Sequence, residues 1–427
     1  MRKNLLGLFV LTSLVVINLS KNLYAAQNPS SPLAKALAHY TMGIIYDNEG
    51  RIEDAVTEYK KALLLDPKVS YLHTRLAVDY LLTRKETLAI EEFELAKSLD
   101  PSDTKPRFLL ALIYTSLAKF ELAQKEYEGI VRFDPDSFRA LSSLADIFIL
   151  QEKLGDAAYI YEKLLEKEKS SSLLYFNLGV IYSRLGKIGP AIEKLTAALK
   201  LKPDYLEAYI GLGILYEMKQ DIPNAILNFK KALKVDPLNI KIYIEWASLY
   251  LKEKRFKDAA ATLEKALESG IKDADVYLAL GYAYSAWGKD EDALKFYKAA
   301  LELKGDEPRV HFYLGAFYEK TKERELAVKE FRETIRLDPD FADAYNYLGY
   351  MFAEEGVNLD EAIILIKKAL EFEPDNGAYI DSLGWAYFKK GMVDEALVEL
   401  ERAIKFEPND PVVRDHLEKI RKRIKDK

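Results

Sequence analysis

The chain of 427 residues is 49% hydrophobic and 30% charged, proportions typical of a folded protein rather than a disordered one. Its formal net charge of −6 gives no chain-wide attraction to nucleic acid, so no nucleic-acid partner is expected. Because cysteine is absent, disulfides, thiolate catalysis, iron–sulfur clusters and thiolate zinc sites are excluded.

Residues 1–26 have the layout of a secretory signal peptide, with Arg2 and Lys3 before the apolar run 5–17. That run is shorter than the roughly 20 apolar residues of a membrane span. Cleavage after Ala25 or Ala26 would place a large residue three positions earlier, so a cleaved signal, an uncleaved anchor and a core helix all stay open. The first two predict an exported bacterial protein in the periplasm or at the outer face of the inner membrane, with membrane contact only through an uncleaved N-terminus.

After a short linker at 27–35, a small residue recurs eleven times at a spacing of 34 residues, once lengthened to 35. In each unit an aromatic residue follows three positions later and an alanine twelve positions later, or thirteen in the longer unit. Proline closes most units. The residues at this small position are Gly43, Ala77, Ala111, Ala145, Gly179, Gly213, Ala247, Gly281, Gly315, Gly349 and Gly384.

Each unit predicts two amphipathic helices, because apolar residues recur at three and four residue spacing on both sides of a polar break. The small position and the later alanine are expected to let the two helices cross closely, with the aromatic residue filling the space between them. Proline is expected to end the second helix. Gly179 and Gly186 resemble part of a phosphate-binding loop, but the spacing is wrong and the hydroxyl is missing, so we interpret them as a crossing residue and a turn residue.

The pattern over residues 36–410 closely resembles the tetratricopeptide repeat family. The resemblance implies an all-α, right-handed superhelical α-solenoid of about eleven tandem helix-turn-helix repeats, whose first helices line a concave groove that binds peptides or protein segments. The regular pattern is broken at 168–173, 268–273 and 304–308, where joints between segments are expected.

Residues 411–427 predict a capping helix with a basic tail, because one apolar stripe would cover the last repeat. The tail is either a solvated face or a contact for anionic lipid or polymer.

No catalytic, metal or cofactor site is expected. His39, His73 and His311 all lie four residues before the small position, where other units have tyrosine, so they are interpreted as packing residues. The chain has no HExxH or GxSxG motif, and the segments outside the repeats are too short for a catalytic domain. We therefore expect a protein that is not an enzyme.

Residues one after and three before the small position share a helical face and are predicted to point into the groove. The candidate partner-binding residues are Tyr282, Phe312, Asn346, Tyr350, Asp381 and Trp385. Alternatively, these aromatic rings pack between neighbouring first helices. The resulting hypothesis is an exported scaffold that binds a peptide or protein segment. The alternative is a cell-envelope polysaccharide export or assembly factor, because aromatic strips with flanking amides also suit sugar rings, and long tetratricopeptide proteins recur in such systems.

Overall fold

The computed structural model describes residues 30–425, so the predicted signal or anchor at 1–26 lies outside the described part of the chain. Within residues 30–425 all regular secondary structure is helical, which confirms the all-α prediction. The first helices of the eleven pairs are α3 (Pro32–Asn48), α5 (Ser70–Leu82), α7 (Thr104–Ser116), α9 (Phe138–Leu150), α11 (Ser172–Arg184), α13 (Leu206–Met218), α15 (Ile240–Lys252), α17 (Ala274–Ala286), α19 (Pro308–Lys320), α21 (Ala342–Glu355) and α23 (Gly377–Lys390). The second helices are α4 (Ile52–Leu65), α6 (Glu86–Leu99), α8 (Phe120–Phe133), α10 (Leu154–Lys167), α12 (Ile188–Leu201), α14 (Ile222–Val235), α16 (Phe256–Glu268), α18 (Asp290–Leu303), α20 (Arg324–Leu337), α22 (Leu359–Phe372) and α24 (Val393–Phe406), and α25 (Pro411–Lys425) follows the last pair.

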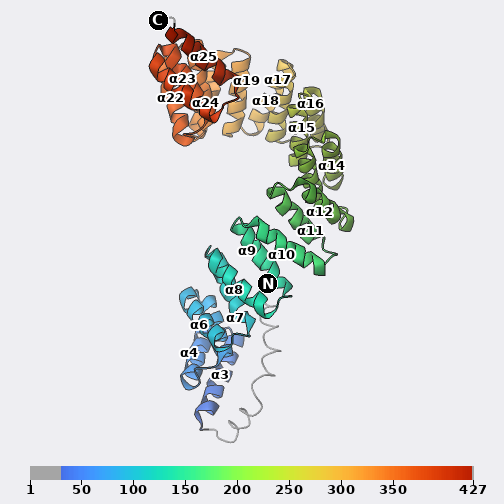
Figure 1. Ribbon diagram of the computed structural model, residues 1–427, viewed down its shortest axis with the longest axis vertical. Coiled ribbons are helices and arrows are strands. Elements are labelled where there is room, and N and C mark those ends of the chain that lie inside the picture. The colour runs from blue at the N-terminus through green and yellow to red at the C-terminus, as the bar shows by residue number, and fades with distance from the viewer. Residues whose placement is uncertain (1–29, 426–427) are drawn as a thin grey trace. The chain divides into compact units, whose positions relative to one another are not determined.

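The helices form two compact units, which divide between Pro203 and Asp204. Unit 1 holds α3 to α12 and unit 2 holds α13 to α25 (Figure 1). Within each unit, a first helix packs on its own second helix, and that second helix packs on the next first helix. This is the helix stacking of an α-solenoid. The division does not fall at any of the three expected joints, which stay predictions about local bending.

Proline ends the second helices as predicted. At Asp66, for example, which precedes Pro67, the backbone leaves the helix at φ −139° and ψ 87°. A residue before proline is driven out of helical geometry by the proline ring. Glu168 and Lys304 lack a following proline but end their helices in the same way. Only the break at 268–273 differs, since α16 ends at Glu268 and Gly270 takes a φ of +88°.

The small position lets the two helices of a pair approach, but the residue that fills the space differs from the prediction. A Cβ atom added to Gly281 would lie 2.6 Å from the ring of Tyr297 on the second helix, and one on Gly213 would lie 2.5 Å from Phe229. The filling side chain therefore comes from the second helix, sixteen residues after the small position. The predicted filler, three residues after it, packs elsewhere in the core. The later alanine is fully buried in every unit, as in Ala191 and Ala293.

Every turn between the two helices of a pair contains one left-handed residue, seven positions after the small position. Gly186 is one of these, with φ +70°, which confirms its interpretation as a turn residue. In six units the position is not glycine: Arg84, Ala118, Glu152, Gln220, Lys254 and Lys322. The longer unit accommodates its extra residue in the same turn, where Asn358 adds a second left-handed residue with φ 48°.

The residue four before the small position holds the turn that precedes its helix. The Nε2 atom of His311 lies 2.9 Å from the carbonyl oxygen of Gly305, and the Tyr345 hydroxyl donates to the carbonyl of Pro339 at 3.1 Å. The other ring nitrogen of His311 lies 2.6 Å from Glu330. The packing interpretation of the histidines therefore holds, with a hydrogen-bonding role that the sequence pattern did not reveal.

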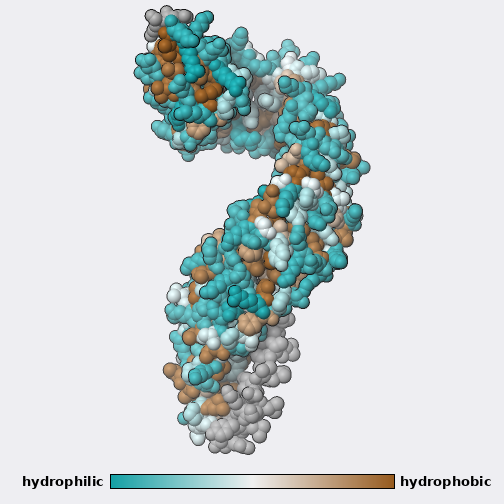
Figure 2. Space-filling view, in the orientation of Figure 1, coloured by the Kyte–Doolittle hydropathy of each residue, from teal (hydrophilic) through white to brown (hydrophobic). Residues whose placement is uncertain are grey.

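No helix within residues 30–425 combines the length and the apolar character needed to cross a membrane. The surface in Figure 2 is mostly hydrophilic, with separate apolar patches, one of them over the C-terminal helices. The exposed apolar residues of that region include Ile364 on α22 and Val398 on α24.

Candidate partner-binding face

In unit 2 the first helices α17, α19, α21, α23 and α25 lie in sequence, each in contact with the next. On each first helix, consider the side chain that directly follows the small position. It lies beside a side chain of the next first helix, the one two residues before the small position of that next helix. Trp385 of α23 and His416 of α25 illustrate this, with ring centroids 4.0 Å apart. Side chains at these two positions make up one face of the first helices, which is interrupted by the small residues Ala316 and Ser382.

Tyrosines occupy this face on α17, α19 and α21. Tyr282 and Tyr347 are 52% and 43% exposed, unusually high values for rings of this size. Tyr313, Tyr350 and Phe312 are partly buried. We call these five residues the tyrosine face.

Phe312 packs against two tyrosines of the tyrosine face through ring contacts. Its ring centroid lies 5.6 Å from that of Tyr313 and 5.2 Å from that of Tyr347, both in edge-on contact. It also packs on Phe341 at 5.1 Å, in the segment leading into α21. Edge-on and offset contacts at these distances stabilise aromatic clusters by about 0.5–1.5 kcal/mol per pair. Phe312 therefore fixes the positions of Tyr313 and Tyr347 within the face.

Acidic groups border the tyrosine face. Partial burial raises the pKa of Glu319, and the neighbouring negative charge of Glu355 raises it further. Burial and the carboxylate of Glu354 raise the pKa of Tyr350 to about 12, with contributions from Asp381 and Glu319. For Tyr347 the pKa is likewise raised, by burial first and then by Asp343 and Glu319. In each case burial is the largest cause of the raised pKa and neighbouring negative charge adds to it, so a cationic ligand would oppose only the smaller, electrostatic part.

The cations nearest to this face are already engaged. Lys320 donates to the side chains of Ser285 and Asp290, both at 2.9 Å. Lys389 donates to the backbone carbonyl of Glu354 at 2.7 Å. These lysines lie at the ends of the first helices and leave Glu319 without a cationic partner among the interactions of the described residues.

The six candidate residues divide into two groups. Tyr282 is open to solvent and Phe312 and Tyr350 are partly buried, so their role in partner binding stays a prediction. Asn346, Asp381 and Trp385 are 8%, 5% and 5% exposed. These three side chains are therefore buried, and their role in partner binding stays a prediction.

Trp385 is buried because α25 covers it. Its ring stacks on His416 with an angle of 10° between the planes, and on Phe388 of its own helix. Its Nε1 atom donates to Glu354 at 2.6 Å. Asp381 lies 2.9 Å from Nδ1 of the same histidine. At this end of unit 2 the face is thus packing, as the alternative interpretation of the aromatic rings expected.

Three residues of the tyrosine face and its border were missed: Tyr313, Tyr347 and Glu319. Tyr313 and Tyr347 lie two residues before the small position, and Glu319 lies four after it. The sequence prediction used only the positions one after and three before the small residue, so it did not include these three. A signal was present, because tyrosine occupies the position two before the small residue in two consecutive units.

A second polar cluster, absent from the sequence predictions, lies in unit 1. The buried carboxylates of Asp47 and Asp79 both lie near Arg75. The hydroxyl of Tyr59 donates a hydrogen bond to Asp47 at 2.6 Å. Burial, together with the negative charge of Asp47, raises the pKa of Asp79 to about 8. The folded chain therefore favours the neutral, protonated form of Asp79. No group of three or more acidic or histidine side chains suited to a metal ion occurs within residues 30–425.

Comparison with known proteins agrees with this architecture. A family model described as the C-terminal domain of cilia and flagella-associated protein 70 matches residues 109–343. Tetratricopeptide repeat models match residues 36–69, 316–378 and 379–410. A search of curated proteins gave no match.

Among solved structures, yeast Tom70 matches with a TM-score of 0.52 and 17% sequence identity, covering 91% of this chain and 96% of Tom70. At that identity the similarity shows the fold. The Cut9–Hcn1 hetero-tetramer of the APC/C matches at a TM-score of 0.44 and 16% identity, over 94% of this chain and 92% of the other. MamA is 29% identical over 38% of this chain and 95% of its own, with a TM-score of 0.33.

Proposed function

Because the chain belongs to the tetratricopeptide repeat family, the fold of many protein–protein interaction scaffolds, we propose that it binds a partner protein through the tyrosine face of unit 2. The ligand is an extended segment rich in lysine or arginine. The observation that carries this proposal is the pair of exposed rings Tyr282 and Tyr347, together with Glu319, which lies near Tyr347 and has no ion-pair partner among the described residues.

The chemistry of the face favours a basic segment over a neutral or acidic one. A lysine or arginine over a tyrosine ring gains about 0.5–1 kcal/mol at exposed sites and about 2 or more when desolvated. Glu319, with its raised pKa, would gain from a cation that stabilises its ionised form. Rigid aromatic residues are also the commonest energetic anchors of protein interfaces. The Phe312 contacts hold such anchors before binding, which reduces the entropy lost when the complex forms.

Two further parts of the proposal rest on the sequence. The basic start and apolar run of residues 1–26 support export to the periplasm or to the outer face of the inner membrane. The absence of a catalytic motif supports a role that is not enzymatic. Fractionation of cells that express the full chain tests the first part: protease sensitivity in spheroplasts is expected, and resistance contradicts it.

The binding proposal is tested with defined probes. Fluorescence anisotropy compares a lysine-rich peptide of about 12 residues with the same peptide carrying glutamate in place of lysine, and with a neutral oligosaccharide. We expect selective binding of the basic peptide, weakened at least about tenfold by Tyr282→Ala, since a truncated anchor costs about 2 kcal/mol.

Tyr159→Ala is the matched control, because Tyr159 is 66% exposed but lies on the second helix α10. It should bind as the unaltered chain does. Equal binding of basic and acidic peptides, or equal loss in the two variants, contradicts the proposal. Binding of the oligosaccharide alone would favour the glycan alternative.

A further inference from the structure

The helix α25 continues the repeat register as the first helix of a twelfth unit. Glu418 falls 34 residues after Gly384, at the small position. Four residues earlier, Arg414 donates to the carbonyl of Pro408 at 2.6 and 2.9 Å, the same relation that His311 has with Gly305. Residues on its inner face, such as Ile420, are buried against the last pair. One side of α25 is therefore packed as in every other unit.

The other side of α25 is the surface that a second helix covers in the preceding pairs. In the eleventh pair, a Cβ atom on Gly384 would lie 2.7 Å from Leu400 of α24, so the second helix sits directly on the small position. No second helix covers Glu418 within residues 30–425. Instead there is an open groove of about 630 Å³ between α24 and α25. Its lining residues are Ile404, Pro408, Arg414, Leu417, Glu418, Arg421, Lys422 and Lys425, and we call it the end groove.

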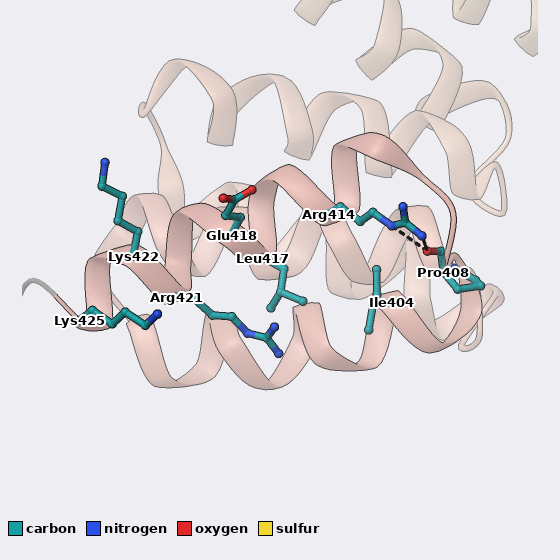
Figure 3. Close-up of a pocket in the computed structure, with 8 residues that line it drawn as sticks. All are labelled: Ile404, Pro408, Arg414, Leu417, Glu418, Arg421, Lys422 and Lys425. Atoms are coloured by element: carbon teal, nitrogen blue, oxygen red, sulfur yellow. Dashed lines mark hydrogen bonds between the residues drawn. The ribbon is translucent and has the colours of Figure 1, made fainter.

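The end groove has an apolar floor and a basic rim. Figure 3 shows Leu417, Arg421 and Ile404 directed into the space between the two helices, with Lys422 and Lys425 toward the C-terminal end of the groove. Four of the lining side chains are cationic and one is acidic. The net charge of these lining residues is thus positive, whereas the net charge of the whole chain is −6.

Most of these cations are free to change partner. The Arg421–Glu401 pair spans 3.1 Å, and its side chains are 57% and 50% exposed. Exposed pairs of this kind stabilise a protein by about 0–1 kcal/mol. Arg421 can therefore exchange Glu401 for another carboxylate with little loss of free energy. Lys422 and Lys425 are exposed and form no ion pair within the described residues.

We propose that the end groove docks an acidic amphipathic helix of a partner protein, which takes the place of a second helix. The site has the shape of a helix seat, because the preceding pairs place a helix of 13 or 14 residues there. Ile404, which is partly buried, and the small exposed part of Leu417 would contact apolar residues at three and four residue spacing on the ligand. The basic rim selects glutamate or aspartate on the flanks of that ligand.

An anionic membrane fits the end groove less well than a helix does. A basic amphipathic helix binds membranes by inserting its apolar stripe into the lipid interface. In α25 most of that stripe is buried: Val413, Leu417 and Ile420 are 3%, 7% and 0% exposed, whereas Ile424 near the end of the helix is 39% exposed. Apart from Ile424, mainly the cationic rim would remain for lipid. The end groove lies at a different place from the tyrosine face, and the charges around it have the opposite sign. Neither proposal therefore depends on the other.

The test uses the full chain and a fluorescein-labelled model peptide of about 16 residues, roughly four helical turns, with leucine on one face and glutamate on the flanks. The variant Lys422→Glu/Lys425→Glu should weaken binding at least about tenfold, because two attractive contacts become repulsive. A peptide with a central proline, which breaks the helix, should bind at least about tenfold more weakly than the parent peptide.

The matched control is Lys295→Glu/Lys298→Glu, which changes the net charge equally in a groove of α18 that also contains Glu291 and Glu302. Its affinity should stay within about twofold, because exposed charges farther away than a Debye length are screened. Equal weakening in both variants would mean that net charge and not the end groove drives binding, and would overturn the proposal. Undiminished binding of the proline peptide would overturn the helical ligand. Binding of phosphatidylglycerol vesicles but not of the peptide would replace the proposal with membrane adsorption.

Discussion

Trp385 and His416 stack face to face, with ring centroids 4.0 Å apart and planes inclined by 10°. The imidazole Nδ1 lies 2.9 Å from the carboxylate of Asp381, and the indole nitrogen donates to Glu354 at 2.6 Å. The stack joins α25 to the last pair through a buried set of polar contacts. It accounts for the burial of two residues that the sequence pattern had assigned to a binding groove.

Trp385→Ala should therefore act on stability. Removing a buried tryptophan leaves a cavity and typically costs about 3–5 kcal/mol. Tyr282→Ala, at an exposed position on the same face, should change stability by at most about 0.5 kcal/mol. Thermal melting of the two variants provides the comparison. A Trp385→Ala variant that melts like the unaltered chain would show that the stack is not part of the core.

The left-handed turns offer a stabilising substitution. Ala118 has a φ of 54°, a conformation that costs a residue with a Cβ atom about 1–2 kcal/mol. Ala118→Gly removes that cost, while greater entropy of the unfolded chain opposes it by about 0.4–1 kcal/mol. We expect a net gain of roughly 0.5–1 kcal/mol in the free energy of unfolding, measured by urea denaturation.

The control for this substitution is Ala111→Gly, inside helix α7, where the same change should cost about 1 kcal/mol. Destabilisation by both variants would argue against strain at Ala118.

Asp79 predicts a dependence of stability on pH. Its pKa is raised to about 8 in the folded chain, against about 3.9 when unfolded. The folded state therefore holds this proton more tightly. The contribution of Asp79 to the free energy of unfolding is fully present below about pH 4. It is lost as pH rises through 8, at up to about 1.4 kcal/mol per pH unit.

Asp79→Asn carries no ionisable group and keeps a donor for Asp47. The stability of the unaltered chain relative to this variant should fall between pH 5 and pH 8, measured by denaturation across that range. A difference that stays constant with pH would mean that Asp79 does not hold the proton.

The helix crossings do not tolerate larger side chains. Ala191 and Ala293 are fully buried where the two helices of a pair cross. Ala191→Leu or Ala293→Leu should cost roughly 1–3 kcal/mol through strain, because the packed core has no room for the added methylenes. Thermal melting checks this, and unchanged melting in both variants would contradict the proposed crossing geometry.

The repeat architecture was predictable because it depends on residues whose effect is local. Gly281 and Ala293 specify a close crossing, and Pro339 a helix end, wherever they occur at this spacing. The filling of the space over Gly281 by Tyr297 was not predicted, since it depends on the exact offset between two helices.

The candidate site was predicted less completely, because exposure depends on neighbouring helices. Tyr282 and Trp385 occupy equivalent positions in their units. The first is exposed, whereas the second is buried under α25, where it stacks on His416. A single repeat pattern cannot distinguish these two environments.

Site-specific photo-crosslinking in the native host tests directly whether the tyrosine face binds a basic segment of a partner protein. A benzoylphenylalanine introduced at position 282 would lie on the tyrosine face, and one at position 159 would lie on an exposed second helix. Mass spectrometry then identifies the captured segment. We expect a crosslink at position 282 to a segment rich in lysine or arginine, absent at position 159 and lost on Glu319→Lys substitution. Crosslinks to acidic or neutral segments, or equal capture at both positions, would contradict it.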